Sequence, residues 1–466
     1  FLLLLSLLSK KLHQPTLLVL ITALITIAPL AYTIAALPQG DQRLQQLGGP
    51  VLAALNGNWQ PVLTYTVQTL GVFTFAGDPI ARYNLPGRPI FDPIAGLLFY
   101  FGLWLAVKHW RDRRNLFALL WLPIGLLPSM LSDSAPSFLR ASVSLPVTFL
   151  FPALALDWLL GKHPGVKAQS TFKVLSVLAS VWLVIAAVFT VRDYFSVWPN
   201  RPDVREIYRS DLALAANWIE QQPTDQPIVI ASTNPRDLDP FLYDFELSGK
   251  HDLRWIDRAY ALAFPTQRSI LISPVYSPID PTLRDRFLAA PVFVSKFEDG
   301  STAFEVYELI PRPAPLAFSN IITLAKTDSM TLTAPIDFNH SLGLLGYEAA
   351  ATARPGDVLK LTLYWRVNKD AGAQQLPVSL FVHLLNDRGE FAAGHDLLAY
   401  PTASWRNGDV WLQQTDVQIP FIQEAGTLHL EIGAYSYADN VRWRIYDPTG
   451  NDVGDRVLLS SVEIKP

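Results

Sequence analysis

The sequence predicts a multi-domain chain with three parts: a polytopic α-helical membrane domain, a small α/β domain, and an antiparallel β-sandwich of jelly-roll or immunoglobulin type. Half of the 466 residues are hydrophobic and only 17% are charged, and the apolar residues gather in the first 191 positions. Helical and strand-like runs then alternate, and from about Pro335 the hydrophobic period becomes two. We place the domains at 1–193, 194–310 and 335–466, with a linker at 311–334.

The composition excludes several classes of protein. A net charge of −4 gives no electrostatic basis for a nucleic-acid partner. The absence of cysteine excludes disulfide frameworks, thiolate metal sites and a cysteine nucleophile. The chain begins at Phe1 inside the run FLLLLSLL, without the charged region or cleavage site of a signal peptide. We therefore expect a partial span there, belonging to a longer protein.

Uncharged runs mark the expected membrane spans. A spanning helix needs at least about 17 apolar residues, and some of these runs are only 15 to 18 residues long. Flanking residues such as Trp104, Lys108, Trp158 and Lys162 can extend them by anchoring at the interface. After the partial span, five full spans are expected: Thr16–Ala36, Pro93–Val107, Asn115–Leu131, Ala141–Leu156 and Val174–Val191.

Lysines and arginines predict the orientation of these spans, because cytoplasmic connections are enriched in both. Basic residues gather at 10–11, 108–114 and 162–173. Alternation then places 37–92, 132–140 and everything after Arg192 outside the cytoplasm. The run Trp59–Phe75 is apolar but contains glutamine and threonine, so we expect it to lie in the outer interface and not to span.

Arg140 lies between two apolar runs, at the outer mouth of an expected span. A guanidinium there is costly unless it meets water or an anion. Two interpretations stay open. Arg140 either snorkels or pairs with Asp133 or Asp92, or it binds a lipid phosphate through the bidentate geometry of its guanidinium.

Two more outer arginines, Arg82 and Arg88, lie in the proline-rich loop GDPIARYNLPGRPIFDP (Gly77–Pro93). We expect them to contribute to the same phosphate site. Turn formation and helix capping are the commoner roles of the two aspartates of this loop. The residues expected to line an outer cavity are Asp78, Tyr83, Asn84 and Asp92.

That loop and the segment SAPSFLRASVSLPVTFLFPALAL (Ser134–Leu156) resemble the C-terminal membrane half of bacterial GT-C glycosyltransferases. The resemblance is to the protein-mannosyltransferase and aminoarabinose-transferase superfamily (family 39-like) and covers about residues 1–195. It implies transfer of a hexose from a polyprenyl-phosphate donor to a glycan, lipid or protein acceptor at the outer face of the bacterial plasma membrane. By position, Arg140 matches the arginine that faces the lipid phosphate in that family.

The resemblance also implies a chemistry. A carboxylate deprotonates the acceptor hydroxyl, and cationic groups stabilise the departing phosphate. In the family that carboxylate lies in the first outer loop, so the catalytic residue is expected upstream of Phe1 and none is assigned here. We expect no cofactor in this segment besides the lipid-linked sugar donor, and a requirement for a divalent metal stays open.

The segment 194–310 reads as an α/β domain on a largely parallel sheet. A helix is predicted over Asp203–Gln222, and PRPAP (Pro311–Pro315) reads as a stiff linker. No glycine-rich phosphate loop is present, so nucleotide binding is not expected. The predicted strands are Ile228–Thr233, Ile270–Tyr276, Val292–Phe297 and Ala303–Leu309.

The predicted sandwich resembles the β-domain that follows such transferases in some bacteria. Core packing is the commoner role of its aromatic residues, and stacking on sugar rings is the alternative. His383, His395 and Asp396 stand on separate strand positions, which does not indicate a metal site. The candidates for stacking are Trp405, Trp411 and Trp443, together with Tyr435 and Tyr437.

The sequence leaves three functions open. The first is the glycosyltransferase. The second is a non-catalytic, membrane-anchored surface module whose sandwich binds glycan or protein. The third, a transporter, is disfavoured because the expected spans carry no charge apart from Asp157, close to the cytoplasmic end of Ala141–Leu156.

Overall fold

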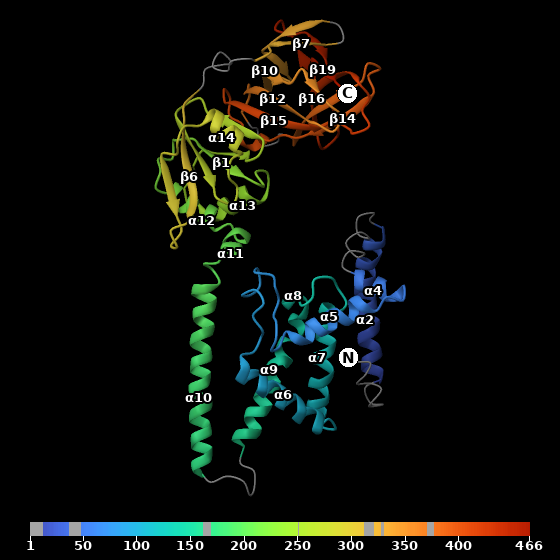
Figure 1. Cartoon of the computed structure of the whole chain (residues 1–466), viewed down its shortest axis with the longest axis vertical. Coiled ribbons are helices and arrows are strands. Elements are labelled where there is room, and N and C mark those ends of the chain that lie inside the picture. Colours follow the sequence, from blue (N-terminus) through green and yellow to red (C-terminus); the bar gives the residue numbers. More distant parts are fainter. Residues whose placement is uncertain are drawn as a thin grey trace. The chain divides into compact units, whose positions relative to one another are not determined.

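The computed structural model describes residues 13–36, 48–161, 169–249, 251–311, 321–327, 330–370 and 377–466. It divides into two compact units, unit 1 (Phe1–Ile207) and unit 2 (Tyr208–Pro466), and each is described by itself (Figure 1). The partial span expected at Phe1, the basic residues Lys10, Lys11, Lys162 and Lys167, and residues 312–320 of the predicted linker lie outside the described residues.

Unit 1 is helical. Helix α6 (Pro93–Lys108) begins where the Asp92 carboxylate accepts hydrogen bonds from the backbone N–H groups of Ile94 and Ala95, at 2.8 and 2.9 Å. Asp92 is therefore an N-cap. The other described helices are α2 (His13–Ala36), α4 (Gly49–Leu55), α5 (Gln60–Gly71), α7 (Arg113–Met130), α8 (Phe138–Ala141), α9 (Leu145–Leu160), α10 (Gln169–Arg192) and α11 (Pro202–Ile207), with a 3₁₀ turn, η2 (Ser142–Ser144), and a π-helical turn, η3 (Asp193–Val197).

Helices α6, α7 and α9 pack around a shared core. Phe99, Ala118 and Phe151, one from each helix, are fully buried. A Cβ atom on Gly102 would lie 1.8 Å from the carbonyl oxygen of Phe151, so the backbones of α6 and α9 are in direct contact. Part of the apolar surface of these three helices is therefore buried between them.

The prediction of a polytopic membrane domain with five full spans is wrong. Among the described residues, two helical segments are long and apolar enough to cross a membrane, Phe138–Leu160 and Lys173–Val197. Of the 18-residue apolar stretch in each segment, 28% is buried in the first and 0% in the second. Helix α6 is about 24 Å long by its rise per residue, short of a hydrocarbon core of about 30 Å. Helix α7 begins with two arginines and contains Pro123 and Pro128. Uncharged runs of 15 to 18 residues suit packed core helices as well as spans, and composition alone did not separate the two.

The first part of unit 2 is a mixed five-stranded sheet with the strand order β2-β1-β4-β6-β5. Strand β1 is parallel to β2 and β4, whereas β6 is antiparallel to β4 and β5, so the expected largely parallel sheet is only half parallel. Its strands are β1 (Ile228–Ser232), β2 (Leu253–Asp257), β4 (Ser269–Pro274), β5 (Phe293–Lys296) and β6 (Thr302–Leu309), with helices α12 (Ser210–Ile219), α13 (Leu238–Glu246) and α14 (Pro281–Phe287).

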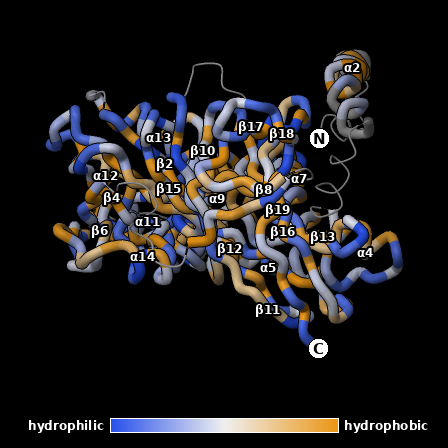
Figure 2. Tube along the Cα trace, turned by 90° about the horizontal axis from the view of Figure 1, so that it is seen from above, coloured by the Kyte–Doolittle hydropathy of each residue, from blue (hydrophilic) through white to orange (hydrophobic). Residues whose placement is uncertain are grey.

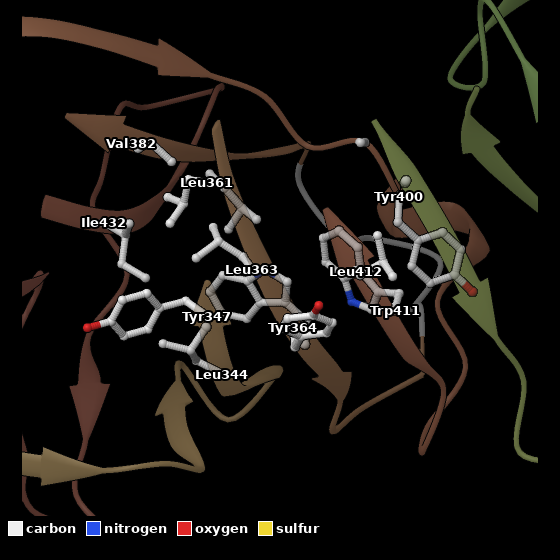
Figure 3. Packing of buried hydrophobic residues seen from close by; sticks show 14 of the residues in the cluster. Leu344, Tyr347, Leu361, Leu363, Tyr364, Val382, Tyr400, Trp411, Leu412 and Ile432 are labelled. Carbon is white, nitrogen blue, oxygen red and sulfur yellow. The ribbon is translucent and has the colours of Figure 1, made fainter. Parts of the chain in front are cut away.

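Two further sheets of seven strands each make up the rest of unit 2. Hydrophobic and hydrophilic residues alternate along many of these strands, as the orange and blue bands of Figure 2 show. Leu361 and Val382, one from each sheet, point toward one another in a common core (Figure 3). One sheet has the order β18-β17-β9-β10-β12-β15-β3, and the other has the order β14-β13-β16-β19-β7-β8, with β11 paired to β19.

The strands of these sheets are β3 (Ala261–Phe264), β7 (Leu324–Lys326), β8 (Thr331–Thr333), β9 (Ile336–Phe338), β10 (Leu342–Ala349), β11 (Thr352–Ala353), β12 (Val358–Val367), β13 (Val378–Leu385), β14 (Phe391–Asp396), β15 (Val410–Gln418), β16 (Gly426–Ser436), β17 (Ile445–Tyr446), β18 (Asp452–Gly454) and β19 (Val457–Ile464).

Strand β3 joins the two parts of unit 2. It lies in sequence between strands of the first sheet, yet it pairs with β15, opposing Phe264 to Val410. A buried ion pair adds to this connection, because Nε of Arg254 on β2 lies 2.6 Å from Oδ2 of Asp409. The α/β and sandwich regions therefore form one compact unit.

Candidate functional site

Asp78 joins the two segments of unit 1 that carry the sequence resemblance. Its fully buried carboxylate accepts hydrogen bonds from the backbone N–H of Ile80 at 2.8 Å and from that of Phe138 at 2.7 Å. A Cβ atom on the neighbouring Gly77 would lie 1.7 Å from the carbonyl oxygen of Arg88, so the loop 77–93 folds tightly on itself. Both carboxylate oxygens are engaged, which makes the role of Asp78 structural.

A pocket of about 340 Å³ opens beside this junction. Three segments of unit 1 line it: the loop 77–93, the region of α8 and α9, and the C-terminal end of α10 with the turn after it. The lining residues are Tyr83, Asn84, Leu85, Arg88, Pro89, Ile90, Phe138, Leu145, Thr190, Asp193, Tyr194 and Trp198.

An ion pair crosses the pocket wall. Nη1 of Arg88 lies 2.5 Å from Oδ2 of Asp193, and both side chains are partly exposed. The side chain of Asn84 donates to the carbonyl oxygen of Arg88 at 3.2 Å, which fixes the backbone of the loop. The contact with Asp193 uses Nη1, and among the described residues no hydrogen bond from Nε or Nη2 of Arg88 is found, so these atoms can donate to a ligand.

The turn after α10 is held against the loop by Trp198. Its indole N–H donates to the carbonyl oxygen of Ala81 at 2.7 Å, and its ring stacks on that of Tyr194 with centroids 5.4 Å apart. The backbone between these residues is the π-helical turn Asp193–Val197. π-Helical turns are rare and frequently occur at functional sites.

Arg140 lies on α8, whose N-cap is Ser137. Its Nη1 atom is buried and has no hydrogen-bond partner within the described part of the chain. A buried donor without an acceptor is costly, and a guanidinium in that condition favours an anion. Arg140 is not among the lining residues of the pocket, although Phe138 and Leu145 on either side of it are.

The predicted site residues thus separate into groups. Arg88, Tyr83 and Asn84 line the pocket, Asp78 ties its loops together, and Asp92 caps α6. Arg82 is exposed and, like Arg140, does not line the pocket. The structure therefore brings one of the three predicted arginines into it.

The predicted sugar-stacking residues need a correction. Trp405 and Trp411 are fully buried core residues, and the indole N–H of Trp405 donates to the carbonyl oxygen of Tyr400 at 2.9 Å. Neither can stack on a sugar, because both indole rings are enclosed in the protein core. Trp443 is partly buried, and Tyr437, directly after β16, is exposed.

Sequence reasoning missed the contribution of Asp193, Tyr194 and Trp198. A signal was present: aromatic residues lie just beyond the uncharged run Val174–Val191, which is typical of a membrane interface. They were assigned to the start of the next domain instead. No sequence pattern pairs Asp193 with Arg88 over a separation of 105 residues.

The histidines make separate contacts. Nε2 of His383 lies 3.4 Å from Oδ1 of Asp396, whereas Nδ1 of His395 lies 3.0 Å from the carbonyl oxygen of Asp416. Over the described ranges, no group of three or more His, Asp or Glu side chains is placed to hold a metal ion.

No protein-family model and no curated protein matches the chain. Parts of solved structures are similar to parts of it. The C-terminal domain of wzt has 10% identity and a TM-score of 0.21 over 28% of this chain and 77% of that one. A Niemann-Pick type C2 protein from the Japanese carpenter ant has 7% identity and a TM-score of 0.16, over 26% and 91%. Spo0M, a sporulation control protein from Bacillus subtilis, has 11% identity and a TM-score of 0.15, over 27% and 50%.

Proposed function

We propose that this chain is the C-terminal part of a membrane-attached hexosyltransferase that uses a polyprenyl-phosphate sugar at the outer face of a bacterial plasma membrane. The observation that supports the proposal is the pocket of unit 1, where a guanidinium and aromatic side chains meet the ends of two long apolar helical segments. Its acceptor is the hydroxyl of a glycan, a lipid or a protein.

The three parts of such a donor match three features of the pocket. The isoprenoid tail suits the apolar surface of Phe138–Leu160 and Lys173–Val197, which supply Leu145 and Thr190 to the lining. The phosphate suits the donors of Arg88 that Asp193 leaves open. The sugar suits the paired rings of Tyr194 and Trp198, because aromatic faces pack against the apolar faces of sugar rings.

Charge explains the role of Arg88 in transfer. When the bond between the sugar and the phosphate breaks, negative charge develops on the departing polyprenyl phosphate, and a fixed cation stabilises it. Arg140 is a second cation in the same unit, with a buried Nη1 atom that lacks an acceptor among the described residues. Because Arg140 does not line the pocket, the proposal assigns the stabilisation of the leaving group to Arg88.

Binding of a polyprenyl monophosphate tests the proposal, since it needs neither the right sugar nor the acceptor. The chain in lipid nanodiscs is titrated with undecaprenyl phosphate, and bound lipid is counted by native mass spectrometry. Arg88→Gln is expected to weaken binding about tenfold or more, which corresponds to at least about 1.4 kcal/mol. The affinity of Arg88→Lys is expected to lie between those of the wild type and Arg88→Gln, because lysine keeps the positive charge but lacks the planar guanidinium that binds phosphate in a bidentate way.

Arg111→Gln is the matched control. It removes one positive charge from the exposed turn before α7, away from the pocket lining. Equal binding by the wild-type chain and Arg88→Gln contradicts the proposal. Equal losses in Arg88→Gln and Arg111→Gln also contradict it, since they indicate general charge attraction.

A second function, the non-catalytic surface module, is favoured by the outer side of the sheet that contains β13, β14 and β16. There the Tyr435 hydroxyl donates to Asp396 at 3.0 Å, beside the exposed rings of Phe391 and Tyr437. A transfer assay with a labelled sugar on polyprenyl phosphate separates the two functions. Glycan binding without any loss of sugar from the lipid favours the module.

A further inference from the structure

Helix α13 carries an exposed apolar stripe. Leu238, Phe241 and Phe245 are 54%, 57% and 73% exposed. Their spacing of three and four residues places them on one face of the helix. The rings of Phe241 and Phe245 touch, with centroids 4.9 Å apart. Large apolar side chains gathered in this way on a surface mark an interaction site more often than isolated ones do.

The opposite face of α13 is firmly held, so the stripe has a fixed direction. Asp239 and Tyr243 are buried. The Tyr243 hydroxyl donates to the carbonyl oxygen of Leu212 on α12 at 3.0 Å, and Oδ2 of Asp239 accepts from Arg209 at 2.9 Å and from the Ser232 hydroxyl at 2.6 Å. Rotating the stripe inward would break these buried bonds.

The chain path restricts where the stripe can reach. The apolar segment Lys173–Val197 ends only a short stretch, Trp198–Ile207, before unit 2 begins. Fully extended, that stretch spans about 35 Å, and its helix α11 shortens it. Helix α12 follows almost at once and holds α13. A surface that the apolar segment enters is therefore within reach of the stripe.

Exposed aromatic residues also lie at the end of the apolar segment and at the start of unit 2. Tyr194 and Phe195 lie in the last turn of the apolar segment, and Tyr208 opens unit 2. Aromatic side chains concentrate at the membrane–water boundary. Asp244 and Glu246 flank the stripe on α13, so attraction to anionic lipid headgroups would not hold the stripe at a membrane, and contact with lipid would have to be apolar.

We infer that Leu238, Phe241 and Phe245 insert into the surface of the lipid bilayer from which the segment Lys173–Val197 emerges. The inference rests on the membrane attachment in the proposed function. It adds a second contact with lipid, made by unit 2 and independent of the pocket. A second copy of the chain or another protein on the same stripe is the alternative occupant that the experiment must separate.

The lack of cysteine makes the test direct, because each introduced cysteine is the only one to label. The full chain in phosphatidylcholine nanodiscs carries an environment-sensitive fluorophore at one of three positions. Phe245→Cys reports the stripe, and Val181→Cys reports the exposed apolar segment. Ile422→Cys, at a sandwich position that is 92% exposed, is the matched control for an apolar residue in water.

Quenching by spin-labelled lipid and by aqueous iodide is then compared. We expect the labels at 181 and 245 to be quenched by spin-labelled lipid, with the label at 245 nearer the headgroups, and the label at 422 to be quenched by iodide alone. Lipid quenching at 181 without lipid quenching at 245 overturns the inference and leaves membrane attachment standing. Protection of 245 from both quenchers also overturns it and indicates a protein partner. No lipid quenching at 181 overturns the attachment itself.

Discussion

The carboxylate of Asp78 accepts a hydrogen bond from the backbone N–H of Phe138 at 2.7 Å, across 60 residues of sequence. This bond connects the loop 77–93 to the segment that carries Arg140. Residues of both the loop and that segment line the pocket in unit 1. The shape of the pocket therefore depends on a buried carboxylate that does not line it.

Asp78→Asn is expected to destabilise unit 1 by about 1–3 kcal/mol, because the two backbone N–H groups bond to different oxygens of Asp78, and the substitution replaces one of these oxygens by an NH₂ group that cannot accept. Asp92→Asn is the matched control and is expected to change stability by a few tenths of a kcal/mol at most, about the difference between two good N-caps. Denaturant unfolding of the detergent-solubilised chain, followed by circular dichroism, measures both. Similar midpoints for the two variants would contradict the assigned role of Asp78.

Asp447 gives a prediction on pH. Its carboxylate accepts from the Thr449 hydroxyl and from the backbone and side chain of Asn451, and these bonds lower the pKa of Asp447 to about 2. Since the folded pKa lies below the unfolded value of about 4, the bonds stabilise the fold above pH 4. That contribution is lost as the pH falls through about 2.

The Asp447→Ala variant is therefore expected to be less stable than the wild type at pH 5 and to approach it as the pH falls toward 2. Thermal unfolding across this range measures the difference. Asp225→Ala, which removes an exposed carboxylate elsewhere in unit 2, is the control. A difference between the wild type and Asp447→Ala that stays constant from pH 5 to pH 2 would exclude the proposed cause.

Trp405 gives a prediction on packing. Trp405→Ala is expected to destabilise unit 2 by about 3–5 kcal/mol, because it removes a fully buried indole and leaves a cavity. Tyr437→Ala, at an exposed aromatic position, is expected to have little effect on stability. Unfolding by guanidinium chloride compares the two. A small loss in Trp405→Ala would restore that residue as a candidate for binding sugar.

Strand β3 gives a prediction on the extent of the folding unit. A fragment Tyr208–Pro466 is expected to unfold in one cooperative transition. A fragment 335–466 lacks both β3 and Arg254, so it exposes an edge of β15 and leaves the buried Asp409 without its cation. Loss of one partner of a buried ion pair typically costs about 3–5 kcal/mol. A stable, monomeric 335–466 fragment would contradict this prediction.

Local patterns predicted much of unit 2, because strand periodicity and turn residues are local properties. The alternation over Leu359–Val367 corresponds to β12, and Ile228–Thr233 corresponds to β1 with one residue of difference. The pairing of β3 with β15 was not predictable, because it joins residues about 150 positions apart. For the same reason, the sequence did not predict whether each pair of strands is parallel or antiparallel.

Unit 1 shows where composition misleads. The run Pro93–Val107 reads identically whether it faces lipid or Phe151 of a neighbouring helix, since both surroundings are apolar. Length separates the two cases better than hydrophobicity does. At the candidate site, the loop arginine Arg88 could be proposed from the sequence, whereas its partner Asp193 could not.

The pairing of β3 with the distant strand β15 also affects where the genes of related proteins can be joined to make chimeras. A crossover between related genes placed in the proline-rich segment near 311–315 looks harmless, yet it would supply β15 with a β3 from a different parent. Inheritance of unit 2 as one block, starting near Tyr208, avoids that mismatch. Chimeras built for altered specificity should use that earlier junction.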